Sequence, residues 1–423
     1  MSAPARLGAL TTWLCGIPSV TGDEDACADA IQTWLQERTS MTVTRHGKCV
    51  LARALAAAPT PAAALRPHVD PPTLRAVLAA DAGSRRDGAS PGASGALAAA
   101  PTPAAAPTPA AAPTTPTPAA SGRPLILLVG HTDTVPPKPG DGPPRIEGDT
   151  IFGLGASDMK GGLAVMLALA EDLFPREGAG SPCAYDLGLV FYDHEEGPWV
   201  KSGLGPLLAE VPWLSTAALA FCLEPSDNVV QLGCMGTLHA QVDFRGRSAH
   251  SARPWQGENA IHKAAGLLAR LAARAPVDVH RDGFLFREVV SATQASGGTA
   301  RNVIPDGFRL NLNCRFAPGR SVEEASEDVR ALVAGEAEVT IVEAAPSGRL
   351  VGENALLRAF VTLNGNAVAA KQAWTDVARL GQAGVDAVNL GPGLAAQAHQ
   401  AGEWASLRLL EESHAQFRRF LAG

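Results

Sequence analysis

The sequence predicts an α/β protein built on a mainly parallel sheet covered by helices, with a small α+β domain inserted into it. Short apolar runs, as in 125–129 and 186–192, are typical of strands buried on both faces, and the helical spacing of apolar residues over 157–174 predicts a helix between them. Between about 236 and 346 the pattern changes to strict alternation of apolar and polar residues. That alternation indicates a sheet with one face exposed to solvent, so the chain combines two kinds of sheet.

The elements of the larger domain follow one another as strand, loop and helix. Residues 42–55 predict a hairpin that turns at His46 and Gly47. Further buried strands are predicted over 216–223 and 385–393. Strands that alternate with helices in this way are typical of a parallel sheet.

Residues 56–122 do not have the composition of a folded segment. Ala, Pro, Thr and Gly dominate, and the unit PTPAAA begins at residues 59, 101 and 107. Proline at this density blocks both helix and sheet, and alanine offers little surface to bury. We interpret the tract as a disordered insertion between neighbouring strands, which costs little extra loop-closure entropy.

The alternating segment forms the inserted domain. Its predicted elements are, in order, strand 238–244, helix 259–275, strands 287–296 and 308–316, helix 321–334 and strand 338–344. This is the βαββαβ order of a ferredoxin-like domain. The predicted boundaries are 1–235 and 349–423 for the two parts of the larger domain and 236–348 for the inserted one.

The composition argues against several classes of partner. A net charge of −7 without a long basic run argues against nucleic acid. The seven cysteines contain no CxxC pair, which suits a reducing compartment better than a disulfide scaffold. No signal peptide is recognisable, and no apolar run reaches the roughly 18 residues of a membrane helix. We therefore expect a cytoplasmic protein with no membrane partner.

Acidic residues and histidines recur where the predicted strands end. The set comprises His131 and Asp133, Asp158 at a helix start, Glu195 and Glu196, Glu224, and His399 in the last loop. Each alone is typical of a solvated turn or a helix N-cap. Strand ends on one edge of a parallel sheet lie close in space, however, and together these side chains suit two zinc-like cations with one carboxylate left over. Five further histidines have no motif around them and are interpreted as surface or packing residues: His46, His239, His262, His280 and His414.

Seven motifs resemble, in order, those of the dinuclear zinc aminoacylase/deacetylase metallopeptidases. They are GHTDTVP, GLGASDMKGGLAV, FYDHEEG, EPS, SAHSARPWQGENAI, NVIPD and AHQAGE, and they span nearly the whole chain apart from the Ala/Pro tract. Within that superfamily, SAHSARPWQGENAIHKA, RNVIPD, RFAPGRSV and KQAWTDVAR most resemble the actinobacterial succinyl-diaminopimelate desuccinylase family. The resemblance implies a zinc-peptidase-like fold for the larger domain and a lid and dimerisation role for the inserted one.

The resemblance also implies a centre of two zinc ions with five protein ligands. His131 and Glu224 would hold one ion, Glu196 and His399 the other, and Asp158 would bridge them. Carboxylate and imidazole ligands admit Co²⁺ or Mn²⁺ as substitutes. The family further implies a cis peptide bond after Asp158.

The remaining implied roles concern the reaction and the substrate. Asp133 would orient the imidazole of His131, and Glu195 would be the general base that takes a proton from the attacking water. His250 would reach into the partner subunit's site and support the oxyanion. The residues implied for substrate binding are Arg315, Asn302, Lys371, Thr375 and Gly391.

The expected reaction is hydrolysis of N-succinyl-LL-2,6-diaminopimelate, a small anionic amino-acid derivative in lysine and diaminopimelate biosynthesis, by a homodimer. One alternative is an N-acetylornithine deacetylase, carboxypeptidase or dipeptidase of the same superfamily. Another is a catalytically silent binding protein that kept the fold. The presence of Glu195 and of all five ligand candidates favours an enzyme.

Overall fold

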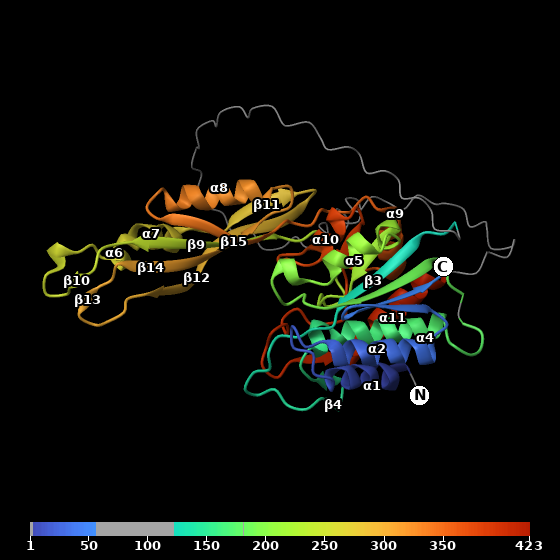
Figure 1. Ribbon diagram of the computed structural model, residues 1–423. Coiled ribbons are helices and arrows are strands. Elements are labelled where there is room, and N and C mark those ends of the chain that lie inside the picture. The colour runs from blue at the N-terminus through green and yellow to red at the C-terminus, as the bar shows by residue number, and fades with distance from the viewer. Residues whose placement is uncertain (1–2, 56–121, 181) are drawn as a thin grey trace, which may run out of the picture.

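The computed structural model describes residues 3–55, 122–180 and 182–423, which form a larger body and an elongated smaller one (Figure 1). The larger body holds the described part of the chain near both termini, and the smaller body extends from it. Residues 56–122, predicted to be a disordered insertion, lie outside the described residues except for Gly122. In the described ranges, no helix combines the length and apolarity that crossing a membrane requires.

The larger body is built on an eight-stranded sheet with the order β1-β2-β6-β3-β7-β17-β8-β16. Its strands are β1 Thr42–His46, β2 Cys49–Ala54, β3 Leu125–His131, β6 Asp186–Tyr192, β7 Leu219–Cys222, β8 Val230–Leu232, β16 Val368–Ala370 and β17 Ala387–Asn389. The central strands β6, β3, β7 and β17 run parallel, and β1–β2 is the predicted hairpin. Every residue of β3 and β6 is buried, as expected for strands covered on both faces. The prediction of a mainly parallel sheet is confirmed.

Helices cover both faces of this sheet (Figure 1). One face packs against α1 Ala3–Cys15, α2 Asp25–Arg38, α4 Gly161–Leu173, α9 Ala355–Asn364 and α11 Leu407–Ala422. The other face packs against α5 Leu204–Glu210 and α10 Val377–Gln382. The helix predicted over 157–174 is α4, and residues 156–160 before it form a kinked turn in which Asp158 and Met159 have non-helical backbone angles. A small sheet of β4 Arg145–Glu147, β5 Thr150–Phe152 and β18 Trp404–Ser406 lies at one end of this body.

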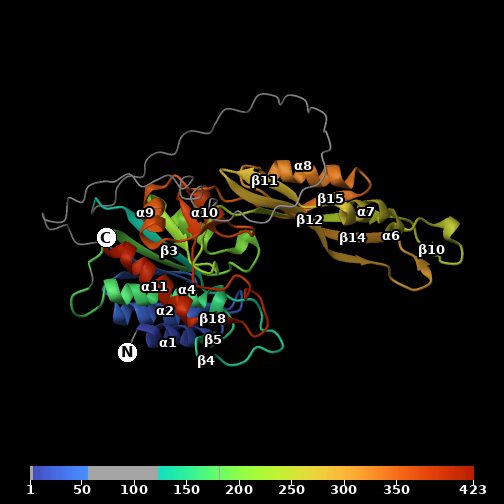
Figure 2. The same ribbon diagram turned by 180° about the vertical axis from the view of Figure 1, so that it is seen from behind.

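The smaller body is an antiparallel sheet of five strands with the order β11-β12-β14-β9-β15 (Figure 2). Its elements are β9 Gly236–Arg245, α6 Ala260–Lys263, α7 Ala265–Ala273, β11 Val277–Arg281, β12 Phe284–Gly297, β14 Gly307–Phe316, α8 Val322–Val333 and β15 Glu338–Ala345. The helices pack on the apolar face formed by alternate residues of β9 and β14. A capping box begins α8, where the Ser321 hydroxyl accepts a hydrogen bond from the Glu324 amide at 3.1 Å. The ferredoxin-like order is confirmed.

Two predicted elements of this domain differ from the structure. The single helix predicted over 259–275 is interrupted at Ala264, where ψ is −9°, so that α6 and α7 are separate. The strand predicted over 287–296 is longer and forms a hairpin with an additional strand, β11. The strand β11 was missed because it is short and mostly exposed, with only Val279 packed against the core, so its alternation is too brief to stand out.

Candidate active site

The carboxyl ends of neighbouring parallel strands bring the predicted polar residues to one edge of the larger sheet. His131 ends β3, while Glu196 and Glu224 follow β6 and β7. Asp158 comes from the kinked turn before α4, and His399 from the loop after β17. Potential ligand atoms of His131, Asp158 and Glu224 lie within 4.8 Å of one another, and so do those of Asp158, Glu196 and His399. The structure therefore groups these side chains into two sets that share Asp158.

Asp158 lies between the two histidines of these sets. Its Oδ1 is 3.2 Å from Nε2 of His131, and its Oδ2 is 3.7 Å from Nε2 of His399. The His399 Nε2 atom is also 2.8 Å from Oε1 of Glu196. Each oxygen of Asp158 thus faces a different imidazole, which is the placement that a bridging carboxylate requires.

The charge balance of the cluster is unfavourable for its carboxylates. Burial, opposed by the charge of His131 and helped by that of Asp158, raises the pKa of Glu224 to about 7. Burial and the charge of Glu224 raise the pKa of Glu195 well above its usual range. Carboxyl groups in such surroundings lack compensating positive charge. One divalent cation in each set would supply it, and imidazole nitrogens with carboxylate oxygens fit Zn²⁺, Co²⁺ or Mn²⁺.

Asp133 connects the imidazole of His131 to the turn that carries the two glutamates. The Nδ1 atom of His131 is 3.0 Å from the backbone oxygen of Asp133 and 3.4 Å from its Oδ1. The same carboxylate accepts hydrogen bonds from the amides of Glu195 and Glu196, both at 3.0 Å. Burial raises the pKa of Asp133, but His131 and these amides outweigh it and lower the pKa overall. Asp133 can therefore orient the histidine and also fix the backbone of both glutamates.

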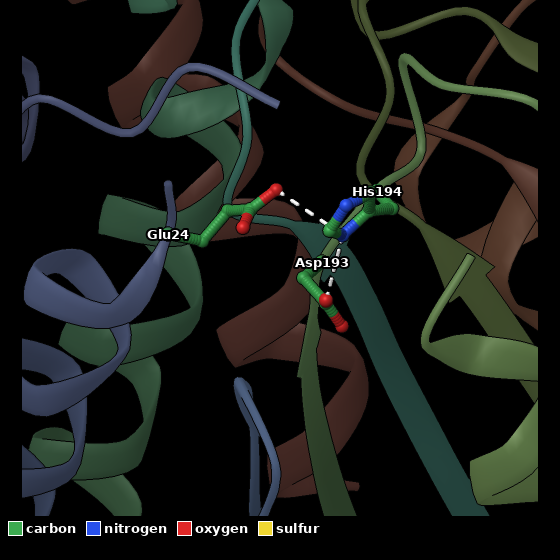
Figure 3. Close-up of side chains that lie close together, drawn as sticks. All are labelled: Glu24, Asp193 and His194. Carbon is green, nitrogen blue, oxygen red and sulfur yellow. Dashed lines mark hydrogen bonds and ion pairs between the residues drawn. The ribbon is translucent and has the colours of Figure 1, made fainter. Parts of the chain in front are cut away.

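A second cluster of side chains contacts the same turn (Figure 3). His194 has a φ of 58°, and its Nδ1 lies 2.8 Å from Asp193 Oδ2 and 3.4 Å from Glu24 Oε1. Glu24 is fully buried and accepts hydrogen bonds from the Gly22 amide and the Lys48 ammonium. These three side chains lie close enough to hold a metal ion. Because Lys48 already supplies positive charge to Glu24, we interpret the cluster as an anchor for the turn.

Glu403 is a functional candidate that the sequence did not reveal. Its buried carboxylate accepts hydrogen bonds from the amides of Gly155, Ser157 and Asp158, each at 2.8 Å. These amides belong to the turn that presents Asp158 and contains the cis peptide bond between Asp158 and Met159 that the resemblance implied. Glu403 is the last residue of the AHQAGE motif, which could have drawn attention to it, but the motif does not indicate which groups its carboxylate contacts.

Glu403→Gln is expected to lower both stability and activity. The glutamine oxygen can keep the amides of Ser157 and Asp158, but its NH₂ group would face the donor of Gly155. One buried donor left without an acceptor costs about 1–3 kcal/mol of unfolding free energy. Urea denaturation should show this loss, with a fall in kcat because Asp158 is less well placed. Unchanged stability and kcat would contradict the assigned role.

The cluster opens into a cleft of about 860 Å³ lined by both bodies. The larger body contributes Lys371, Trp374 and Thr375, and the smaller one contributes His239, Arg315 and Glu343. His239, interpreted from the sequence as a surface or packing residue, therefore lies in the candidate site. The signal that could have found it is its position on the polar side of the alternation in β9.

The residues implied for substrate binding fall into two groups. Arg315, Lys371 and Thr375 line the cleft. Gly391 instead packs against the backbone at Leu223 and Glu224, where a Cβ atom would lie 2.2 Å from the backbone oxygen of Leu223. Asn302 lies beside β13 Val303–Ile304, which pairs with β10 Ala249–His250 at the far end of the smaller body (Figures 1 and 2). Within one chain, His250 and Asn302 are thus distant from the cleft.

Comparisons with known proteins identify a matching domain family and similar proteins of known name. A family profile described as a peptidase dimerisation domain matches residues 232–340. A protein of Mycobacterium tuberculosis strain H37Rv, provisionally named a succinyl-diaminopimelate desuccinylase, is 42% identical over 301 residues, which cover 70% of this chain and 82% of that protein. The succinyl-diaminopimelate desuccinylase of Corynebacterium glutamicum is 34% identical, covering 70% of this chain and 80% of the relative.

Solved structures share the fold at low sequence identity. Aminopeptidase PepT of Bacillus cereus superposes with a TM-score of 0.66 at 16% identity, covering 99% of this chain and 98% of that one. The Bacillus subtilis YXEP protein, described as a dinuclear metal binding peptidase from the M20 family, superposes with a TM-score of 0.61 at 13% identity, covering 99% and 97%. At such identities the likeness concerns the fold alone.

Proposed function

We propose, from the premise that this chain belongs to the M20 metallopeptidase family and to its succinyl-diaminopimelate desuccinylases, that it hydrolyses N-succinyl-LL-2,6-diaminopimelate to succinate and LL-2,6-diaminopimelate. As a member of this family it is an amide hydrolase. The observation that carries the reaction is the pair of ligand sets that share Asp158, with Glu195 beside them. The names of the relatives support the substrate and its place in lysine and diaminopimelate biosynthesis.

The proposed cofactors are two zinc ions. His131 and Glu224 would hold one and Glu196 and His399 the other, with Asp158 shared between the two sets. When bound, such cations polarise an amide carbonyl and make water a stronger acid. The ligand set itself also admits Co²⁺ or Mn²⁺.

Glu195 is the proposed general base. One of its carboxylate oxygens lies within 4.8 Å of potential ligand atoms of His131 and Glu196, and its backbone is fixed by Asp133. The carboxylate accepts a proton as water attacks the amide carbonyl carbon. It then delivers the proton to the amide nitrogen as the carbon–nitrogen bond breaks. The two adjacent glutamates thus have different proposed roles: Glu195 transfers the proton, and Glu196 is a metal ligand.

The cleft has the cations that a substrate with three carboxylates requires. Arg315 lines the cleft from the smaller body and has no carboxylate partner among the described residues. Lys371 lines the same cleft from the larger body. Thr375, which is almost fully buried, offers a hydroxyl without a hydrogen-bond partner in the described chain. We assign Arg315, Lys371 and Thr375 to substrate binding.

A homodimer completes the proposed enzyme. The match to a peptidase dimerisation domain covers most of the smaller body. Within one chain, His250 and Asn302 lie at the end of that body away from the cleft, a position from which they can serve a neighbouring subunit. We propose that His250 supports the oxyanion in the partner's site and that Asn302 contacts substrate there. The cytoplasm is the proposed compartment.

Hydrolysis assays on the purified, zinc-loaded protein test the proposal. N-succinyl-LL-diaminopimelate, N-acetylornithine and a dipeptide are offered separately, and the released succinate, acetate or amino acid is measured. We expect succinate release at a kcat/KM at least about 100-fold above the other two, since the buried polar groups that pair with a substrate carboxylate would otherwise stay unpaired.

Other outcomes would replace this function by a defined alternative. Cleavage of N-acetylornithine alone would indicate a deacetylase, and cleavage of the dipeptide alone would indicate a peptidase. Two bound metal ions without cleavage of any substrate would indicate a silent binding protein.

A further inference from the structure

We propose that His239 and Asn313 are positioning residues that fix the guanidinium of Arg315 for the carboxylate of the acyl group, and so determine selectivity for succinyl over uncharged acyl groups. The proposal rests on the function proposed above. It concerns two residues that have no part in the metal centre and that the sequence motifs do not single out.

The three residues form one hydrogen-bonded row on the polar face of the inserted sheet. Asn313 on β14 is directly opposite His239 on β9. The Arg315 Nε group donates to Asn313 Oδ1 at 3.1 Å, and Asn313 Nδ2 donates to His239 Nε2 at 2.9 Å. His239 and Arg315 both line the cleft. The row of hydrogen bonds therefore connects His239 through Asn313 to Arg315, the side chain proposed to contact the substrate.

The direction of each hydrogen bond follows from the arginine. A guanidinium is always a donor, so Asn313 must turn its oxygen toward Arg315 and its NH₂ group toward His239. His239 Nε2 is then an acceptor, and the ring carries its proton on Nδ1. Asn311 Nδ2 lies 3.3 Å from Nδ1 but is itself a donor, so it does not accept this proton and donates to Thr293 Oγ1 at 2.7 Å instead. The orientation of the whole row is fixed by its one charged member.

This arrangement leaves the binding end of Arg315 free. Only Nε has a hydrogen-bond partner in the part of the chain that the structure describes, so both terminal nitrogens remain for a ligand. The nearest acidic neighbour in register with His239 is Glu343, which instead accepts the Trp199 amide at 3.0 Å. A guanidinium held through Nε presents its two terminal NH₂ groups as a fork, which matches a carboxylate.

Substitutions that break the row without touching the metal centre test the proposal. We expect Asn313→Leu and His239→Phe to raise KM for N-succinyl-LL-diaminopimelate about tenfold, the effect of one weakened charged hydrogen bond, while kcat stays within about twofold. N-acetyl-LL-diaminopimelate lacks the acyl carboxylate, so its kcat/KM should not change. His239→Gln keeps an acceptor for Asn313 and should stay within about threefold of wild type. In an Arg315→Gln background, Asn313→Leu should have no further effect.

His280→Phe is the matched control, because His280 is an exposed histidine on β11, outside the residues that line the cleft. It should leave the ratio between the two substrates unchanged. Equal losses on both substrates in Asn313→Leu and His239→Phe, or an unchanged ratio, would overturn the proposal.

A second measurement decides the positioning even if the proposed function fails. The Nε–H signal of Arg315 in ¹⁵N–¹H NMR spectra, assigned by its loss in Arg315→Gln, should exchange slowly with water in the wild type. It should exchange fast in Asn313→Leu. A wild-type enzyme inactive on N-succinyl-LL-diaminopimelate would refute the function alone, whereas equally fast exchange in both proteins would refute the positioning role.

Discussion

Glu195→Ala is expected to lower kcat by about 10²- to 10⁴-fold with little change in KM, because a positioned general base contributes about that factor to proton transfer. The backbone of Glu195 is held by Asp133, so the substitution removes the carboxylate and leaves the turn in place. Steady-state kinetics on N-succinyl-LL-diaminopimelate measure the effect. Glu195→Asp keeps a carboxylate on a shorter side chain, so its kcat should lie between that of the wild type and that of Glu195→Ala.

The metal content distinguishes a base from a ligand. Glu195 lies within the same 4.8 Å limit of His131 and Glu196 as the ligands do of one another, so geometry alone permits either role. Plasma mass spectrometry should find two metal ions per chain in Glu195→Ala and fewer in Glu196→Ala. If Glu195→Ala loses a metal ion and Glu196→Ala does not, the two roles are exchanged.

The polar residues at the strand ends could be predicted from the sequence because the chain changes there from apolar to polar residues. All residues of β3 and β6 are buried, so a continuous apolar run must end where the chain leaves the sheet. Parallel topology then places the ends of β3, β6 and β7 at one edge, whatever their separation along the chain. That reasoning brings together residues such as His131 and Glu224, but their pairing in sets came only with the family resemblance and the coordinates.

Residues that act through the backbone or through strand register could not be predicted in this way. Glu403 is 245 positions from Asp158 and contacts backbone amides, which are the same for every sequence. His239 meets Asn313 only because β9 and β14 pair in one register, and a shift by one residue would place them on opposite faces. Alternation reveals which side of a strand is polar, but the partner across the sheet is fixed by the folded chain.

Glu224 is expected to destabilise the metal-free protein as the pH rises. Burial and the charge of Asp158 raise the pKa of its carboxyl to about 7 in the metal-free protein, from an ordinary value of 4.5. The folded state therefore holds a proton that the unfolded chain has released. The free energy of unfolding of the metal-free protein should fall as the pH rises from 4.5 to about 7. Above pH 7 the buried charge of Glu224 should lower the free energy of unfolding by its full amount, of the order of 1–3 kcal/mol.

Glu224→Gln is expected to abolish activity while stabilising the metal-free protein. A neutral amide cannot replace a carboxylate ligand, so the ion assigned to His131 and Glu224 should be lost. We expect kcat/KM to fall by at least about 10³-fold. The same change removes the buried charge, so after chelation the variant should be more stable than wild type at pH 8 by about 1–3 kcal/mol and equal to it near pH 4.5. Urea denaturation of both proteins, with chelator and then with zinc, measures this. Zinc should reverse the order, because binding stabilises only the chain that retains the site. A metal-free variant less stable than wild type at pH 8 would show that Glu224 contributes to folding through contacts that its charge does not disfavour.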